Sequence, residues 1–312
     1  MGNPLVSIAC ITYNHASFIR QCLDGFIMQQ VDFEFEIVIH DDASTDGTRD
    51  IILEYCAKYP HLFRPILQEE NKYKDGKGIY ARFVFPECRG KYIAMCEGDD
   101  YWTDSLKLQK QVDYLRSNSD YVMCSHAYES LLQNENKILT SYGVKSFTYD
   151  LKFLIQGGWA YQPLTIVFDK NQLDSNYYLY RNTKDMSLFY ALLKNGKGRY
   201  LEDTMAIYRV HNNGVWSGLN LEAQFITNFN NRIGIYEIEK TESAAMFILS
   251  LWDRPWGRKI LIKNLGVFVR CLQVFSIHWG RMFALKLFVY KFLLIGNFSQ
   301  KFSILLGEIN RK

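Results

Sequence analysis

The sequence predicts an α/β fold in which a mostly parallel sheet is flanked by helices, followed by a helical C-terminal extension that is both basic and apolar. Two observations support this: strand-like and helix-like patterns alternate along the chain, and three predicted strands end in polar clusters. Of the 312 residues, 48% are hydrophobic and 22% charged, which is typical of a globular protein and excludes a disordered one.

The elements are predicted from the spacing of apolar residues. Residues 6–11 form an apolar run typical of a buried strand, whereas the apolar residues of 17–30 recur at helical spacing. Residues 44–48 supply a turn and caps for the helix that follows. The remaining predicted elements are strands at 35–39, 65–67, 91–95, 121–125 and 166–168, helices at 79–85 and 105–117, a helix opened by residue 185, and a strand-like run at 206–211.

The three polar clusters are Thr12-Tyr13-Asn14, Asp41-Asp42 and Glu97-Gly98-Asp99-Asp100. Carboxyl ends of parallel strands meet at one edge of a sheet, where ligands bind. Three carboxylates within four residues repel one another, and a divalent cation that also holds a diphosphate would relieve this repulsion. The alternative is three unrelated polar turns in solvent. Neither G-x-G-x-x-G after the first strand nor G-x-x-x-x-G-K-[ST] occurs, which disfavours a dehydrogenase or a P-loop NTPase.

The sequence resembles a family 2 glycosyltransferase of the GT-A fold. The motifs that carry the resemblance are V-S-I-A-C-I-T-Y-N-H (6–15), E-I-V-I-H-D-D-A-S-T-D-G-T (36–48), R-G-K-Y-I-A-M-C-E-G-D-D (89–100), K-D-M-S-L (184–188) and A-I-Y-R-V-H (206–211). The resemblance implies a domain at 1–218, with a nucleotide-sugar half at 1–126 and an acceptor half at 127–218, and leaves 219–312 as the extension. It implies transfer of a sugar from a nucleotide-diphosphate donor to a hydroxyl, with inversion.

The resemblance also implies roles for single residues at the donor. Asp42, with Asp41 beside it, would accept a hydrogen bond from the edge of the base, Asp99 would hold the ribose, and Asp100 would bind Mn²⁺ or Mg²⁺ together with His211. Glu97 stands where the family more often has Asp, so its role stays open. The full set of expected donor-binding residues is Thr12, Tyr13, Asn14, Asp41, Asp42, Arg82, Glu97 and Asp99.

Asp185 is the expected catalytic base, and its alternative is an ordinary capping residue at the start of a helix. Glu202 and Asp203 compete for the role, and Lys184 would lower the pKa of Asp185. Trp102, Trp159 and Trp216 are expected to stack on acceptor sugars, although each is equally plausible in the core.

Residues 251–312 contain 11 Lys and Arg but 2 Asp and Glu. A predicted helix at 257–275 separates basic from apolar residues, which is typical of a helix lying on an anionic membrane. A helical subdomain packed on the body or on a second subunit is the alternative. Nucleic-acid binding is disfavoured because the basic residues are interleaved with apolar ones.

The seven cysteines form no C-x-x-C pair and no leader peptide is visible, so we expect a cytoplasmic protein, peripheral at the inner face of the membrane.

The expected function is therefore a metal-dependent inverting glycosyltransferase. Its donor would be a nucleotide-diphosphate sugar, with UDP preferred, and its acceptor a glycan or lipid-linked hydroxyl in surface polysaccharide synthesis. Two alternatives stay open: a nucleotidyltransferase of related fold, and a degenerate transferase that acts as a membrane assembly partner.

Overall fold

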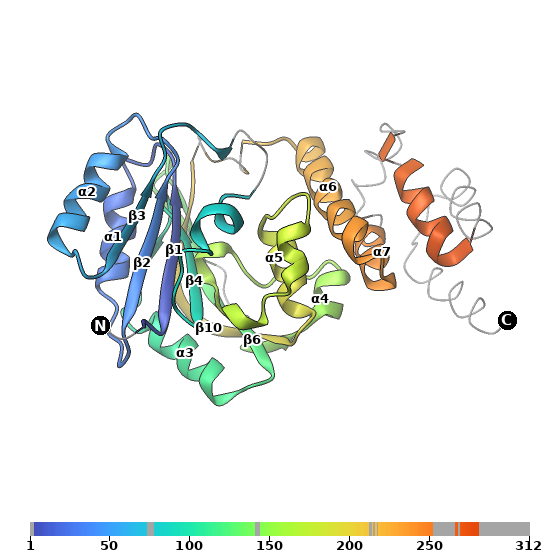
Figure 1. Ribbon diagram of the computed structural model, residues 1–312, viewed down its shortest axis with the longest axis horizontal. Helices are drawn as coiled ribbons and strands as arrows, with labels where there is room; N and C mark the ends of the chain where they lie inside the picture. The colour runs from blue at the N-terminus through green and yellow to red at the C-terminus, as the bar shows by residue number, and fades with distance from the viewer. Residues whose placement is uncertain are drawn as a thin grey trace. The chain divides into compact units, whose positions relative to one another are not determined.

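A computed structural model of the chain has the expected α/β architecture, a central sheet with helices against it (Figure 1). It describes residues 3–73, 78–140, 144–211, 214, 216, 218–251, 266–267 and 269–280. The chain divides into two compact units, one made of residues 1–154 and 158–218 and the other of residues 155–157 and 219–312.

The N-terminal part of the sheet is parallel and follows the predicted strands closely. β1 pairs with β2 and β4, and β2 also pairs with β3, all in parallel. The side chains of β1, β2 and β4 are almost all buried, which explains their apolar runs in the sequence, whereas the edge strand β3 buries only Phe63. The elements are β1 (Val6–Thr12), α1 (Ile19–Ile27), β2 (Phe35–Asp41), α2 (Thr48–Lys58), β3 (Phe63–Leu67), the π-helical turn η2 (Tyr80–Val84) and β4 (Tyr92–Glu97).

The remaining strands make the sheet mixed. The order is β3-β2-β1-β4-β9-β6-β10-β5, with β7 added beside β6 and β8 beside β10. β6 and β10 are parallel, whereas β5, β7, β8 and β9 all pair antiparallel to their neighbours. The strands are β5 (Tyr101–Trp102), β6 (Tyr121–Leu132), β7 (Lys137–Thr140), β8 (Phe147–Tyr149), β9 (Val167–Asp169) and β10 (Lys197–Val210).

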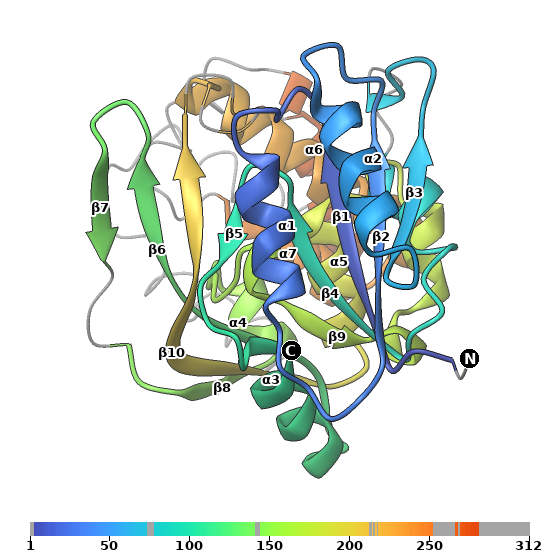
Figure 2. The same cartoon turned by 90° about the vertical axis from the view of Figure 1, so that its left-hand side faces the viewer.

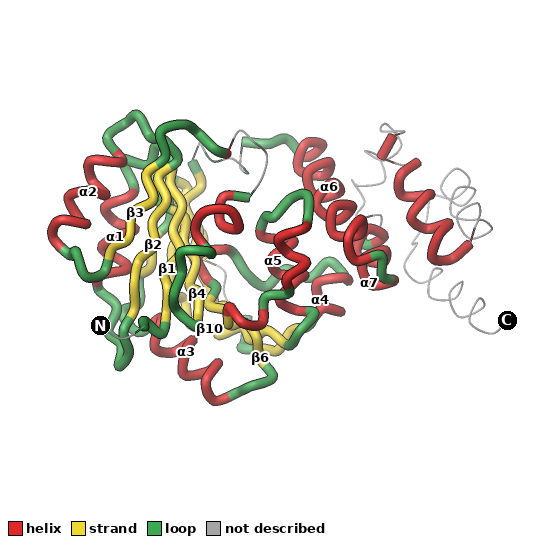
Figure 3. Tube along the Cα trace, viewed as in Figure 1, coloured by secondary structure: helices red, strands yellow, loops and turns green. Residues whose placement is uncertain are grey.

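Helices cover both faces of this sheet. Figures 2 and 3 show α1 and α2 against one face, and α5 on the other side of the strands. α5 buries every residue except its first, Asp185, which is half-buried. The other helical segments of this unit are α3 (Lys107–Ser117), α4 (Leu151–Ile155), η3 (Pro163–Thr165), η4 (Lys170–Gln172), η5 (Ser175–Leu179) and α5 (Asp185–Leu193).

The register of the parallel strands brings the polar clusters to one edge. Ile11 of β1 lies opposite Glu97 of β4, and Thr12 lies opposite Asp41 of β2. The three strands therefore end side by side, as the sequence predicts for a site at their carboxyl ends.

The second unit is helical where it is described. α6 (Leu221–Glu239) begins at Asn220 and α7 (Glu242–Leu249) begins at Thr241, and each of these N-cap side chains accepts a backbone N–H bond. Residues 269–280 are helical, but 252–265 and 268 lie outside the described residues, so the predicted amphipathic helix at 257–275 is described only in part. In the described part of the chain, no helix is both long and apolar enough to cross a membrane.

Candidate active site

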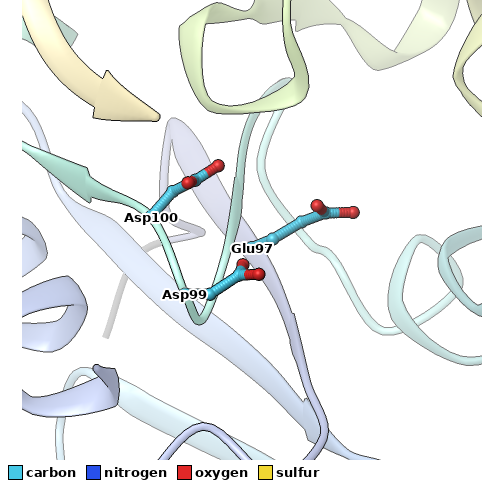
Figure 4. Close-up of side chains that lie close together, drawn as sticks. All are labelled: Glu97, Asp99 and Asp100. Carbon is cyan, nitrogen blue, oxygen red and sulfur yellow. The ribbon is translucent and has the colours of Figure 1, made fainter. Parts of the chain in front are cut away.

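The acidic turn after β4 is the centre of the candidate site. Carboxylate oxygens of Glu97, Asp99 and Asp100 lie within 4.8 Å of one another (Figure 4). The turn is tight because Gly98 packs on β1: its N–H donates to the carbonyl of Ile11 at 2.9 Å. A Cβ at this position would lie 2.7 Å from Thr12 Oγ1, so a larger residue would displace the turn.

Asp99 is held between two histidines. His211 Nε2 lies 3.0 Å from Asp99 Oδ2, and His15 Nε2 lies 3.7 Å from the same atom. Burial alone would raise the pKa of Asp99, but the His211 hydrogen bond and the charge of His15 outweigh it, and the pKa is lowered. Asp99 is therefore the carboxylate of the turn that is kept ionised. Its Oδ1 atom is buried and has no hydrogen-bond partner among the described residues.

Asp100 points instead toward β10. It is buried, and its Oδ1 accepts the backbone N–H of Arg209 at 2.8 Å. Burial, followed by the charge of Asp99, raises the pKa of Asp100 well above its usual range. Asp100 and His211 were both expected to bind the metal, and that assignment stays a prediction. In the structure His211 lies within hydrogen-bond distance of Asp99, whereas Asp100 Oδ1 accepts from the backbone of β10.

The side chain of Arg209 fixes the acidic turn from the same strand. Its Nη1 donates to the carbonyl of Asp99 at 2.6 Å, and its Nη2 donates to Gln21. The guanidinium lies 4.5 Å from the ring centre of Tyr101 and 5.1 Å from that of Phe18. Arg209 and His211 thus reach the same turn from alternate positions of the chain, as the sequence predicts from strand periodicity.

Asp185 lies within electrostatic reach of Glu97. Burial raises the pKa of both carboxyl groups, and the negative charges of Asp99 and then Asp185 add to the effect at Glu97. Lys184, which precedes helix α5, opposes the effect at both groups. The start of the helix is anchored because Tyr177 Oη donates to the carbonyl of Thr183 at 3.1 Å.

Asp42 holds a neighbouring chain segment. Its two carboxylate oxygens accept the backbone N–H groups of Lys72 and Tyr73, at 2.7 and 2.9 Å. Asp41 is fully buried, and its Oδ2 accepts from Arg49 Nε at 3.2 Å. Both expected base-binding carboxylates therefore already bind protein groups, and any contact with a base would share the remaining acceptor capacity of their oxygens.

The block 44–48 fixes the loop after β1. Its polar side chains bond to the backbone and to Asn14, whose φ of 55° puts it in the left-handed region. These bonds determine where His15 sits, although sequence reasoning did not select His15 as a site residue. The bonds run from Asn14 N to Ser44 Oγ (2.9 Å), from Thr45 N to Asn14 Oδ1 (2.9 Å), from His15 N to Thr48 Oγ1 (2.8 Å) and from Ala16 N to Asp46 Oδ2 (2.9 Å).

The other expected donor residues lie around this loop. Tyr13 is 43% exposed and leaves a ring face open, whereas Thr12 is buried and its Oγ1 has no partner among the described residues. Arg82 Nη1 donates to the carbonyl of Lys72 at 3.5 Å, and its guanidinium lies 4.7 Å from the centre of the Phe83 ring. Arg82 therefore reaches the segment that Asp42 holds.

The three expected acceptor tryptophans differ in exposure. Trp102 is 2% exposed and its Nε1 donates to the carbonyl of Leu164 at 2.9 Å, so the indole belongs to the core and offers no face to a sugar. In this structure Trp102 is therefore a core residue and not the acceptor contact that was expected. Trp159 and Trp216 are 42% and 44% exposed, and Trp159 packs 5.4 Å from the ring centre of Phe189 in α5.

The mixed α/β sheet, with an acidic turn at the carboxyl edge of its parallel strands, has the architecture of the GT-A glycosyltransferases. The chain belongs to glycosyl transferase family 2, which matches residues 7–209.

Curated relatives agree with this assignment. An uncharacterized protein of Mycobacterium tuberculosis is 37% identical over 225 residues, which cover 68% of this chain; the chain spans only 60% of that relative's length. The putative teichuronic acid biosynthesis glycosyltransferase TuaG of Bacillus subtilis is 30% identical over 222 residues, covering 69% of this chain and 82% of TuaG.

Among solved structures, S. aureus TarS in complex with UDP matches with a TM-score of 0.61 and 16% identity, covering 86% of this chain and 80% of that one. The mannosyltransferase PcManGT from Pyrobaculum calidifontis, in complex with GDP-Man and Mn²⁺, matches with a TM-score of 0.52 and 14% identity, covering 94% and 88%. At these identities the likeness concerns the fold.

Proposed function

We propose that this glycosyltransferase is metal-dependent and inverting, and that it moves a sugar from a nucleoside diphosphate to a hydroxyl group. The observation that carries the proposal is the Asp99 carboxylate, which is kept ionised beside His211 within an acidic turn. Asp185, at the start of a helix within electrostatic reach of that turn, supplies the second chemical group that an inverting transfer needs.

The residues present fit a divalent cation. Asp99 and His211 provide an oxygen and a nitrogen next to each other, and Asp99 Oδ1 is buried without a partner among the described residues. Mn²⁺ and Mg²⁺ both accept carboxylate oxygen, and a nitrogen ligand favours Mn²⁺. We therefore assign the metal to Asp99 and His211, with Asp100 supporting the turn and Glu97 facing the donor. When bound, the cation neutralises charge on the diphosphate.

Asp185 is proposed as the base that takes the acceptor proton. The free N–H groups at the start of α5 stabilise its anion, while burial raises its pKa. The effect of burial is the larger of the two, so the carboxylate is more basic than an exposed aspartate. Glu202 and Asp203 are both exposed, and Asp203 is bonded to Lys110 at 2.8 Å, so neither competes well for this role.

The donor is proposed to be a UDP-sugar whose base lies against Tyr13, beside Asn14 and the segment that Asp42 and Arg82 hold. Tyr13 offers an exposed aromatic face for stacking. The S. aureus TarS structures contain UDP and UDP-GlcNAc, which supports a uridine donor for this fold.

The acceptor is proposed to be a hydroxyl of a glycan or lipid-linked glycan in surface polysaccharide synthesis, contacted by Trp159 and Trp216. TuaG is named for teichuronic acid biosynthesis, and a poly(ribitol-phosphate) β-glucosyltransferase is 32% identical over 97 residues. A cytoplasmic enzyme held at the inner membrane face or in a homo-oligomer by the basic C-terminal residues suits such an acceptor, and we assign no nucleic-acid partner.

Turnover of sugar nucleotides tests the proposal. We expect release of nucleoside diphosphate with Mn²⁺ or Mg²⁺, loss of this activity in excess EDTA, and loss in Asp99→Asn. Full activity in EDTA would contradict the metal, and full activity in Asp99→Asn would contradict the assignment of Asp99. Pyrophosphate release from a nucleoside triphosphate would indicate a nucleotidyltransferase instead, and nucleotide binding without turnover would indicate a degenerate transferase.

A further inference from the structure

Lys184 places a positive charge next to the proposed base. Its side chain is half-buried, and its Nζ lies 3.3 Å from Tyr73 Oη and 5.3 Å from the centre of the Tyr73 ring. Among the described residues its ammonium forms no ion pair with a carboxylate. An ammonium group has three donors, and a phenol oxygen uses only one of them. Counting its contacts within the described ranges, Lys184 therefore keeps most of its capacity to bind an anion.

Lys184 also lies between two parts of the site. On one side, its partner Tyr73 donates its backbone N–H to Asp42 Oδ2 at 2.9 Å, which ties Lys184 to the nucleoside side. On the other side it is the N-cap residue of α5 and directly precedes Asp185, the first residue of that helix. A cation in this position is available to an anionic group bound between the Tyr73 segment and Asp185.

The chemistry of inversion identifies that group. The attacking hydroxyl and the leaving diphosphate lie on opposite sides of the sugar carbon, so the sugar lies between Asp185 and the diphosphate held at Asp99 and His211. We propose that Lys184 binds an acidic group on the transferred sugar, so that the donor is a nucleoside diphosphate uronate. This inference rests on the proposed function and names its substrate class.

Two other sources of negative charge fit less well. The diphosphate is assigned to the Asp99–His211 side of the acidic turn, whereas Lys184 contacts Tyr73 and lies at the start of α5. An anionic acceptor would approach from the acceptor side, but the contact of Lys184 is with Tyr73, on the segment held by Asp42. The carboxylate at C6 of a uronic acid is the remaining group, and a charge-assisted bond to it would give specificity.

The test compares donors that differ at one carbon. UDP-glucuronate carries a carboxylate where UDP-glucose carries a hydroxymethyl group. We expect wild-type protein with Mg²⁺ to bind UDP-glucuronate about tenfold or more tightly than UDP-glucose in calorimetry, because bonds to charged groups give discrimination of this order. Lys184→Met should abolish the preference for UDP-glucuronate. Its affinities for UDP and UDP-glucose should stay within about twofold of the wild-type values, because a lost charged contact would change them by much more.

Two further variants serve as controls. Lys184→Arg retains the charge and should retain a preference for the uronate. Lys58→Met changes the net charge equally and removes a similar lysine–tyrosine contact, 5.2 Å from the Tyr59 ring centre, at the end of α2. It should leave all three affinities unchanged. Thermal melting of each variant shows whether it is folded, and a folded Lys184→Arg keeps the test decisive if Lys184→Met is unstable.

Equal binding of the two donors by wild-type protein would overturn the inference. So would a Lys184→Met variant that weakens UDP by the same factor as UDP-glucuronate, because the ammonium would then bind the diphosphate. A Lys184-dependent preference that appears only with an acidic acceptor would assign the charge to the acceptor. If GDP is the diphosphate that binds, the GDP-mannose and GDP-mannuronate pair replaces the uridine pair. Absence of binding by UDP, GDP, dTDP and their sugars would instead refute the proposed function itself.

Discussion

Replacing Lys107 by Met tests the most unusual charge in the core. Lys107 begins α3 and is fully buried; its Nζ lies 2.9 Å from Gln111 Oε1 and 4.0 Å from the centre of the Trp102 ring. Burial lowers its pKa from 10.5 to about 7. Trp102 directly follows the acidic turn, so Lys107 packs against a residue that borders the site.

The magnitude follows from linkage. Between pH 7 and 10.5 the unfolded chain binds the proton of Lys107 more tightly than the folded protein does, so this residue makes the folded state more stable as pH rises through that window. A shift from 10.5 to about 7 corresponds to about 5 kcal/mol in total. Met removes the titration, so the stability of Lys107→Met relative to wild type should fall by about 4 kcal/mol from pH 7 to pH 10.

Urea unfolding of both proteins at pH 7, 8.5 and 10 measures this difference. Lys110→Met is the matched control, because Lys110 lies on the same helix, is 36% exposed and pairs with Asp104 and Asp203. Its difference from wild type should change little with pH over this range. A Lys107→Met difference that is equally flat would refute the reasoning, since the buried amine would then be no harder to protonate than an exposed one.

Three further predictions concern the site. Asp185→Asn should lower kcat about 10²–10⁴-fold and leave UDP binding intact; undiminished transfer by this variant would exclude Asp185 as the base. Because the pKa of Asp185 is raised, the activity of the wild-type enzyme should fall on the acid side at a pH above the usual aspartate pKa. His211→Ala should weaken Mn²⁺ binding about 10–100-fold in calorimetry, and an unchanged affinity would leave Asp99 without its proposed partner. Gly98→Ala should cost about 1–3 kcal/mol in urea unfolding, because the added Cβ would lie 2.7 Å from Thr12 Oγ1 and 2.9 Å from Ile19 Cδ1; an unchanged stability would mean that the turn has room for a side chain.

Most of the parallel half of the fold was predictable because β1, β2 and β4 are buried on both faces and read as apolar runs. β6 and β10 were found only in part: the sequence indicated 121–125 and 206–211, but the strands extend over Tyr121–Leu132 and Lys197–Val210. β10 carries register irregularities against β6, which interrupt the alternation that a regular strand would show. Strand direction leaves no mark in a short buried segment, so the antiparallel β9 could not be distinguished from a parallel strand.

The candidate site was predictable at the level of clusters but not of atoms. The structure brings His211 beside the acidic turn, but which of Asp99 and Asp100 it meets depends on which carboxylate accepts from the backbone of β10, and residue order does not reveal this. Trp102 was equally ambiguous, because an aromatic residue beside a site looks the same in the sequence whether it faces a ligand or the core.

His15 shows how the motif at 44–48 acts on the site. The side chains of Thr48 and Asp46 in this motif accept hydrogen bonds from the backbone of the loop after β1. They therefore determine the position of the His15 imidazole, which lies 3.7 Å from Asp99. The block is therefore a support for the loop, and its effect on a ligand passes through His15 and the neighbouring Tyr13. For this reason Thr48→Val, which removes the bond from His15 N, should weaken donor binding with little change in the isolated chemical step, whereas Asp185→Asn should do the reverse. A Thr48→Val variant that lost kcat at unchanged donor affinity would show that the loop positions the reacting groups instead.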